Sequence, residues 1–351
     1  MSTAKIVRVR KAGTSDPFAV LPGNTADFNA EQGNADDSVF GASYTSTQTT
    51  LTNWSVSANA LYRGFAGYNT VIKKSGTPVP FTDEAMSEEE PDSQTYIVDD
   101  QTTTPWDWNG DVTVYDDGVE VSADDIASID TNFGRVTFVD GYTVTGPVTV
   151  DAATVPMTAF GNASSFDLTQ NSDTTETTSF EIAQANGGYS TFRATLRTVS
   201  LSLTAFYRAD NDFDDLLQSR EDFVVEINPD GNEQSVARGI FRVSSEGNSG
   251  DVGGDEETSV ELVLAVPEGR VPFSWKHAST TTMPEGLRIV LDAYENQDNL
   301  EVEYLPEGLG NPGKRGEVVL TDASINSEVD GIVEAAFEGQ GTGPFESINN
   351  P

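Results

Sequence analysis

The sequence has one histidine, His277, and any Ser-His-Asp triad would have to use it as the base. This residue lies in the stretch Trp275-Lys-His-Ala278, and the chain has no Gly-x-Ser-x-Gly motif to supply a nucleophilic serine. A lone histidine next to an aromatic residue is usually a packing or surface residue, so we do not expect this type of catalysis. The chain has no cysteine, so thiolate chemistry and disulfides are excluded, and a structural zinc site would lack its usual ligands.

Carboxylates are the most abundant side chains that could act as acids, bases or ligands, with 57 Asp and Glu residues against 19 Lys and Arg. In any fold of this composition many carboxylates lie within the ~10 Å that paired-carboxylate glycosidases use, so their proximity carries no signal. Asp212, Asp214 and Asp215 form a cluster that calcium or magnesium could occupy, but the EF-hand pattern is absent and the charges suit the start of a helix. We therefore predict no catalytic, cofactor-binding or metal-binding residues, and a protein that is not an enzyme.

Two glycine-rich stretches resemble phosphate-binding loops in composition alone. The stretch Glu246-Gly-Asn-Ser-Gly250, with Gly253-Gly254, lacks the Lys-Ser/Thr pair of such a loop and is not followed by a parallel strand and helix. We interpret it as a mobile loop between two strands. The stretch from Gly308 to Gly316 is similar, although Lys314 and Arg315 make it a rare positive spot.

The formal net charge of -38 at pH 7 restricts the environments and ligands that suit the chain. Such a surface repels itself in ordinary buffer, whereas salt shortens the screening length to about 3 Å near 1 M. The composition predicts adaptation to high salt rather than disorder, because 36% of the residues are apolar and they fall in short alternating runs. Specific binding of DNA or RNA is not expected, since that affinity comes mainly from Lys and Arg.

No stretch approaches the roughly 18 consecutive apolar residues of a membrane span. The basic N-terminus is not followed by the apolar stretch of a signal peptide. We therefore expect a chain that is made in the cytoplasm, has no membrane partner and leaves the cell only as part of a particle.

Residues 1–51 are rich in Ser, Thr, Asn, Asp and Gly and show little periodicity, which predicts an extended N-terminal arm. Its first eleven residues are basic, with Lys5, Arg8, Arg10 and Lys11, whereas the rest of the chain is acidic. Two interpretations stay open: a frayed terminus, or a positive arm that docks on an acidic neighbour and becomes ordered there.

Residues 52–150 predict a small antiparallel β module with closely spaced hairpins. In the clearest of these, Asp116-Asp117-Gly118 supplies the positive φ of a tight turn between Val112–Tyr115 and Val119–Val121. The other expected strands and turns are Trp54–Ala58, Asn132-Phe133-Gly134 before Arg135–Phe138, Asp140-Gly141 before Tyr142–Val144, and Val148–Val150.

Residues 151–345 predict longer strands, of which Phe192–Tyr207 alternates apolar and small polar residues most clearly. One short helix is expected over Asp210–Gln218. Residues 267–313 are interpreted as an extra hairpin or loop insertion, and residues 346–351 as a C-terminal tail. The further expected strands are Phe223–Ile227, Gly239–Val243, Ser259–Leu264, Glu317–Leu320 and Gly331–Phe337. The predicted fold class is all-β.

One series of segments has a distinctive order and spacing: Pro80–Ala85, Thr95-Tyr-Ile-Val98, Val112–Val121, Phe133-Gly-Arg-Val-Thr-Phe138 and Thr145–Val150. This series resembles the N-terminal part of some major tail tube proteins of long-tailed viruses. The second half is similar to the tube fold itself, in its long strand, the short helix at Phe213–Leu217, the strand Arg238–Val243 and the end at Phe337–Gly343. Together the resemblance covers about residues 63–345.

The resemblance implies an antiparallel β-sandwich or barrel whose strands join those of neighbouring copies in a ring, usually a hexamer. Stacked rings would form the tail tube of the virion, assembled in the host cytoplasm, through which viral DNA passes without specific binding. Other tail proteins (tape measure, terminator, baseplate or tip) would be its partners. Together with the acidic composition, the resemblance predicts a virus of a halophilic archaeon.

Two alternatives stay open. The first is another β-rich virion component, such as a tail terminator, a sheath protein or a capsid decoration protein. The second is a secreted halophilic β-sandwich protein that acts on carbohydrates or mediates adhesion, which would need a signal sequence that is not visible.

Overall fold

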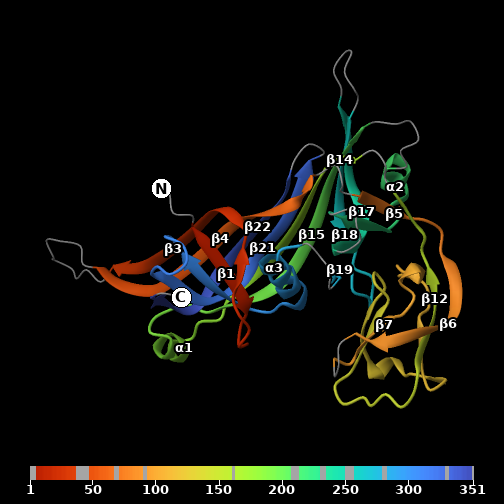
Figure 1. The fold of residues 1–351 in the computed structure, drawn as a ribbon, viewed down its shortest axis with the longest axis horizontal. Coiled ribbons are helices and arrows are strands. Elements are labelled where there is room, and N and C mark those ends of the chain that lie inside the picture. Colours follow the sequence, from red (N-terminus) through yellow and green to blue (C-terminus); the bar gives the residue numbers. More distant parts are fainter. Residues whose placement is uncertain are drawn as a thin grey trace. The chain divides into compact units, whose positions relative to one another are not determined.

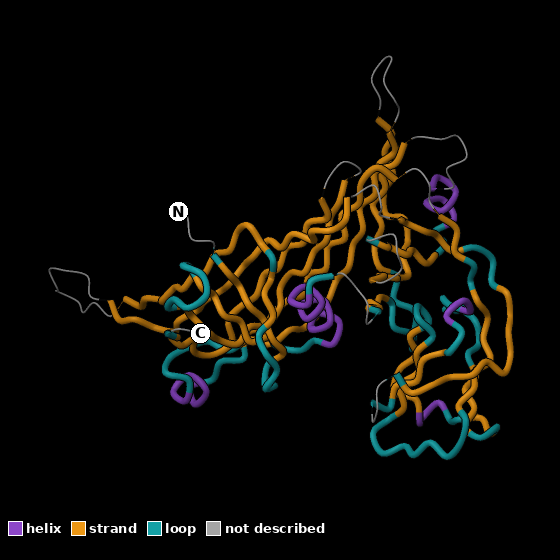
Figure 2. Tube along the Cα trace, in the orientation of Figure 1, coloured by secondary structure: helices purple, strands orange, loops and turns teal. Residues whose placement is uncertain are grey.

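The structure is a computed structural model, and strands make up most of it (Figures 1 and 2). It describes residues 5–36, 47–66, 71–89, 93–159, 163–206, 213–229, 235–249, 257–278, 283–328 and 332–349. The strands of the described residues pair mainly in antiparallel hairpins and long antiparallel ladders, so the predicted all-β class is confirmed. No helix in these described ranges has the length and apolar character needed to cross a bilayer.

The chain folds into two compact units, and neither is continuous in sequence. Unit 1 contains Met1–Ala66, Asp167–Val199 and Thr282–Pro351, and unit 2 contains Gly67–Phe166 and Ser200–Thr281. The sequence predicts consecutive segments instead, with boundaries at residues 52 and 150. The difference arises because long strands near both ends of the chain pair with each other, which brings distant segments into one unit.

Unit 1 contains a sheet in which the strand order is β3, β4, β22, β21, β20, β1, β2. The strands are β1 (Ile6–Lys11), β2 (Ala19–Leu21), β3 (Gly23–Asp36), β4 (Thr47–Ala66), β20 (Leu300–Leu305), β21 (Gly313–Glu328) and β22 (Ile332–Ile348). Phe28 of β3 stacks on Tyr304 of β20 with ring centroids 5.9 Å apart. The sheet therefore curls, so that β3, at one end of the strand order, comes close to β20, near the other end.

Trp54 of β4 shows why β21 and β22 need glycine where they cross it. A Cβ atom at Gly341 would lie 2.2 Å from the indole ring, and one at Gly316 would lie 2.5 Å from it. The indole Nε1 donates a hydrogen bond to the carbonyl of Gly343 over 2.8 Å. The glycine-rich end of the chain is thus part of the strand β22, and it is fixed by packing.

The expected N-terminal arm is wrong for residues 6–36, which form three strands of unit 1. β1 lies between β20 and β2, and Val7 and Val9 point into the core with 2% and 0% of their surfaces exposed. The basic residues alternate with these valines and face acidic partners, with Arg8 opposite Glu303 and Arg10 opposite Glu301. The positive segment does dock on an acidic neighbour, and that neighbour is β20 of the same chain.

The interpretation of residues 267–313 as an added hairpin or loop is also wrong. Residues Glu285–Asn296 form the helix α3, and Leu287, Val290, Leu291 and Tyr294 are buried at helical spacing. The Tyr294 hydroxyl donates to the carbonyls of Asn171 and Thr198, which attaches the helix to the two strands described next. The flanking segments β19 (Phe273–His277) and β20 are integral strands of the sheets.

Two long strands, β14 (Ala163–Glu176) and β15 (Phe192–Phe206), have residues in both units, and the short helix α1 (Phe180–Ala185) lies between them. The predicted alternation in β15 is confirmed, because Val199, Leu201, Leu203 and Ala205 are buried.

The expected short helix is confirmed as α2 (Phe213–Ser219). Instead of one α-helix, the described residues contain three.

In unit 2, the strand order of one sheet is β13, β5, β16, β17, β18, β15, and β19 pairs with β17. The strands not yet given are β5 (Val71–Ser75), β13 (Met157–Ala159), β16 (Phe223–Asn228), β17 (Ser235–Ser249) and β18 (Glu257–Leu264). The expected mobile loop is wrong for Glu246–Ser249, which continue β17 and pair with β18. Gly250, Gly253 and Gly254 lie outside the described residues.

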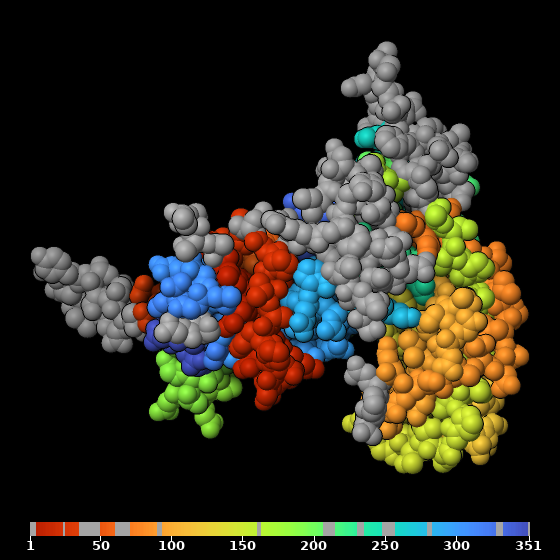
Figure 3. Space-filling model, in the orientation of Figure 1, coloured from red at the N-terminus to blue at the C-terminus, as the bar shows by residue number. Residues whose placement is uncertain are grey.

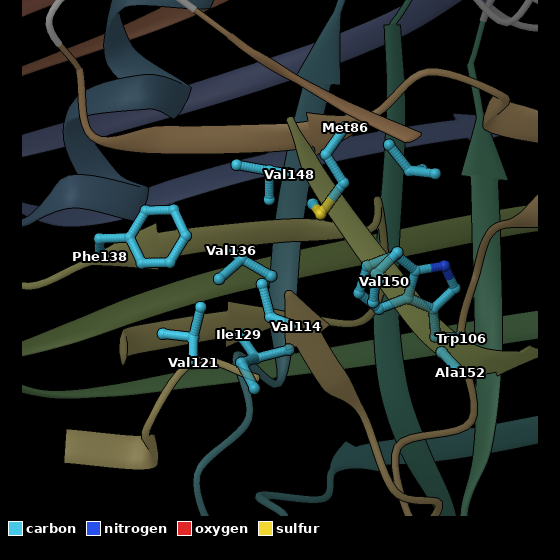
Figure 4. Packing of buried hydrophobic residues seen from close by; sticks show 11 residues of the cluster. Met86, Trp106, Val114, Val121, Ile129, Val136, Phe138, Val148, Val150 and Ala152 are labelled. Atoms are coloured by element: carbon cyan, nitrogen blue, oxygen red, sulfur yellow. The ribbon is translucent and has the colours of Figure 1, made fainter. Parts of the chain in front are cut away.

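Unit 2 also contains a seven-stranded antiparallel sheet, which we call the β module (residues 79–154). Its order is β10 (Ile126–Asp130), β11 (Arg135–Phe138), β7 (Thr95–Val98), β6 (Val79–Glu88), β12 (Val148–Thr154), β8 (Thr113–Asp116), β9 (Val119–Glu120). Two 3-10 helices, Gln101–Thr103 and Ala123–Asp125, connect strands. Figure 4 shows its core, where Trp106, Phe138, Val136 and Val150 are fully buried.

The hairpin predictions in the β module are mostly confirmed. Asp117 and Gly118 have positive φ angles of 51° and 76°, and β8 pairs with β9 across them. β10 and β11 form the second hairpin. The third is wrong, because Tyr142–Val144 form no strand; Asp116 instead accepts hydrogen bonds from Tyr142, Thr145 and Gly146 and holds this loop.

Candidate functional site

His277 is a partly buried residue of β19. Its ring stacks on that of Trp275, with centroids 5.6 Å apart and planes within 10° of parallel. Its Nδ1 lies 3.1 Å from the Ser235 hydroxyl. Because Ser235 has 0% of its surface exposed, this hydroxyl is not accessible to a substrate.

The acidic cluster near α2 lies largely outside the described part of the chain, since Asp212 and the side chain of Asp214 are not described. Within the described ranges, no group of three or more His, Asp or Glu side chains is placed to hold a metal ion.

Unit 1 has an acidic row of side chains that crosses its sheet. Directly opposite residues share one face of a sheet. Asp27 of β3 lies opposite Ser57 of β4, Ser57 lies opposite Glu338 of β22, and Glu338 lies opposite Asp322 of β21. Asp167 belongs to β14, which neighbours β21, and its charge acts on Asp322. We call these five residues the acidic row.

The residues beside the acidic row are also small and polar. Asn59 lies opposite Ala336, and Ala336 lies opposite Ser324, on the next row of the same face. The strands β14 and β22 contain no Lys or Arg anywhere in their sequences. At the edge of the row, Lys5 pairs with Asp27 over 3.2 Å, and this pair is exposed. The described side chains of the face thus form a hydrophilic surface with little positive charge.

The alternation of the strands places the core of unit 1 on the opposite face. Val56, Ala58, Phe337, Ala323 and Leu168 all have less than 5% of their surfaces exposed. The polar side chains of the acidic row are therefore fixed outward by the packing of their sequence neighbours.

Asp322 is the least solvated carboxylate of the acidic row. Burial raises its pKa above the ordinary value, and the negative charges of Glu338 and Asp167 raise it further. A hydrogen bond from the Ser324 hydroxyl opposes these effects. The carboxylates of the row are therefore close enough for the charges of two of them to raise the pKa of Asp322.

The β module contains a single positive side chain, Arg135, since no other Lys, Arg or His occurs between Lys74 and Arg193. Arg135 forms ion pairs with Asp130 over 3.3 Å and with Glu89 over 3.0 Å. Its Nη1 also donates to the carbonyl of Trp275 on β19 over 3.2 Å. The one cation of the module is thus used to attach it to the neighbouring sheet of unit 2.

Arg238 of β17 joins the same two sheets from the other side, because it donates hydrogen bonds to residues of the β module. Its Nη1 donates to the Thr104 hydroxyl over 2.8 Å and to the carbonyl of Asn132 over 2.6 Å, and its Nε pairs with the buried Glu226 over 2.7 Å. The guanidinium groups of Arg238 and Arg135 lie 4.8 Å and 5.3 Å from the centre of the Phe133 ring. We call Arg135, Arg238 and Phe133 the arginine clamp.

A third charged cluster lies in unit 1 around Glu303, which has 0% of its surface exposed. Arg8 and Arg315 both donate hydrogen bonds to its carboxylate, from Nε over 2.7 Å and 2.9 Å. The positive spot expected at Lys314 and Arg315 is therefore largely neutralised. Lys314 bonds to the Ser347 hydroxyl and lies 5.0 Å from the centre of the Phe345 ring.

Sequence reasoning missed all three arrangements, although two of them left a signal. The isolated Arg135 within a long acidic stretch is visible in the sequence. So is the alternation of basic and apolar residues in Ile6-Val-Arg-Val-Arg10. The acidic row left no such signal, because its members come from five strands that are distant in sequence.

Comparison with known proteins gives limited similarity. No model of a known protein family matches this chain, and no curated protein matches it. Among solved structures, a chain from the virion of a native gene transfer agent particle is 16% identical, with a TM-score of 0.28, over 34% of this chain and 88% of that chain. A chain from the tail of an empty gene transfer agent particle, treated with helical refinement and C6 symmetry, is 15% identical with a TM-score of 0.28, over 34% and 86%. At these values no function follows from the similarity.

Proposed function

We propose that this protein is a structural subunit of a viral tail tube, in which the acidic row of each copy faces the lumen. The observation that carries the proposal is the hydrophilic face of unit 1, which presents carboxylates and small polar groups across five strands. Its partners are further copies of the same chain, in stacked rings that the sequence resemblance implies to be hexameric.

A wall of this composition suits a conduit for DNA. Proteins retain DNA mainly through Lys and Arg contacts to phosphates, with accompanying release of counterions. A carboxylate such as Glu338 offers a phosphate no such contact, so a duplex moves past it without binding. In molar salt the screening length of about 3 Å keeps the repulsion short-ranged, so the duplex still enters the channel.

The same charge pattern supports assembly of the particle in concentrated salt. We propose the virion of a long-tailed virus of a halophilic archaeon, with assembly in the host cytoplasm and with other tail proteins at the two ends of the tube. The function is mechanical and requires no catalytic residue, so the packed state of His277 is compatible with it.

Electron microscopy of the purified protein in molar salt tests the assembly. Rings or tubes with an open lumen are the expected result. Isolated monomers at every salt concentration would contradict the proposal, and monomers that hydrolyse a glycan would favour the carbohydrate-active alternative.

The role of the acidic row is tested by reversing its charge in assembled tubes. Glu338→Lys tubes are expected to retain double-stranded DNA that wild-type tubes release, because each ring then carries a circle of ammonium groups. The control is Glu307→Lys, at an exposed position of the turn after β20 and outside the acidic row. Equal DNA retention by the two variants would show that Glu338 does not face the lumen.

A further inference from the structure

The segment of residues 177–198, which we call the hairpin tip, differs from the rest of the chain in charge. It contains one acidic residue, Glu181, and two basic residues, Arg193 and Arg197, in a protein whose formal net charge is -38. Arg197 is used within unit 1, because its Nη1 donates to the carbonyl of Tyr294 over 2.9 Å. Arg193 is exposed and forms no ion pair with any residue that the structure describes.

The hairpin tip also exposes large apolar side chains. Phe180 has 99% of its surface exposed, Leu196 has 72% and Ile182 has 37%. The Ser179 hydroxyl accepts a hydrogen bond from the Ile182 amide over 3.2 Å and caps the first turn of α1, in which Phe180 is almost fully exposed. Figure 3 shows this green segment projecting beside the red and blue surface of unit 1.

The strand β15 changes character where it enters the hairpin tip. Residues 199–205 alternate between buried and partly exposed positions, whereas residues 195–198 are exposed one after another. A strand gains most of its stability from a buried face and cross-strand contacts. Residues 195–198 therefore lack the buried face that residues 199–205 have.

We propose that the hairpin tip binds the acidic surface of a second copy of this chain. Charge complementarity points to the occupant, because the tip carries positive charge beside exposed apolar side chains, whereas the chain as a whole has a net charge of -38. Arg193 pairs with carboxylates of the second copy, and Phe180 and Leu196 are removed from solvent there. This inference rests on the proposed function, since it names the contact through which the copies assemble.

Photo-crosslinking tests the occupant directly. The chain has no cysteine, so Phe180→Cys and Leu309→Cys each provide one position for benzophenone maleimide. Leu309 is the matched control, because it is an apolar residue of unit 1 with 54% of its surface exposed, outside the hairpin tip. In molar salt we expect the label at position 180, and not the label at position 309, to produce a covalent dimer joined to an acidic segment of the second copy. Equal dimer yields from both positions, or no dimer from position 180, would overturn the inference.

A second measurement compares the assembly of Phe180→Ser and Arg193→Glu with that of Leu309→Ser, by light scattering in molar salt. The two tip variants are expected to need roughly tenfold higher subunit concentration to assemble, whereas their circular dichroism spectra match the wild type. If the wild type and all variants assemble alike, the inference fails and the proposed function stands. If the wild type never assembles, both fail.

Discussion

Arg135 of the β module donates a hydrogen bond to the main-chain carbonyl of Trp275 on β19, over 3.2 Å. A single arginine thereby contacts two sheets of unit 2, since it also pairs with Asp130 and Glu89 of the module. Ser274, next to Trp275, donates to the same Asp130 over 2.9 Å, and the Val271 amide donates to the carbonyl of Ile129 over 3.0 Å. The module is therefore joined to β19 and the residues before it by a connected polar network.

Substitution of Arg135 should remove its ion pairs and its hydrogen bond to the Trp275 carbonyl from this network. We expect Arg135→Met to lower the free energy of unfolding of unit 2 by about 2–3 kcal/mol, because Asp130 and the Trp275 carbonyl lose a charged donor at a largely buried position. The control is Arg242→Met, whose ion pair with Asp222 is half-exposed and should be worth less than about 1 kcal/mol. Urea unfolding in molar salt measures both, and equal effects would contradict the proposed role of the arginine clamp.

Because β1 lies between β20 and β2, deleting it should affect the folding of unit 1. If the basic terminus were an arm that docks on another copy, deleting residues 2–11 would weaken stacking more than folding. With Val7 and Val9 buried and Arg8 bound to the buried Glu303, we now expect the deletion to unfold unit 1. Loss of the near-ultraviolet circular dichroism signal at every salt concentration would support this, whereas a cooperative unfolding transition like that of the wild type would contradict it.

Asp322 should make stability depend on pH in a specific direction. Its pKa is raised in the folded state, so the folded protein binds this proton more tightly than the unfolded chain, and the resulting penalty appears as pH rises through the folded pKa. We expect Asp322→Asn to stabilise the protein at pH 7, by up to about 1 kcal/mol in moderate salt. The gain should vanish near the ordinary aspartate pKa of about 4.

Thermal unfolding of Asp322→Asn at pH 7 and at lower pH measures this difference, with the exposed Glu307→Gln as the control. A destabilised Asp322→Asn protein at pH 7 would show that Asp322 is ionised and favourably bound, contrary to the account given above.

Salt should control the stability of the whole protein. Below about 0.5 M salt the screening length lengthens, and the net charge of -38 should loosen the fold or the assembly. Circular dichroism and light scattering across a salt series measure the two effects separately. Signals that stay constant from dilute buffer to molar salt would refute the prediction.

Local patterns in the sequence were sufficient for much of unit 2. The alternation of Val199, Leu201, Leu203 and Ala205 identifies β15, and Asp117-Gly118 identifies a hairpin, because both depend only on neighbouring residues. The helix α3 was missed although Leu287, Val290, Leu291 and Tyr294 have helical spacing, since the apolar run 289–291 also suits a strand.

The acidic row was beyond sequence reasoning for a different reason. Its residues meet only when β3, β4, β22, β21 and β14 adopt one particular register, and a shift by a single residue would turn them to the other face. That register is fixed by tertiary packing, such as the contact of Trp54 with Gly341, which no local pattern specifies.

The most direct test is a reconstruction by electron microscopy of the assembly formed in molar salt. We predict a hollow tube of stacked rings in which Glu338, Asp322 and Asp167 line the inner wall. A tube whose inner wall carries Lys and Arg, or a protein that stays monomeric at every ionic strength, would contradict the account.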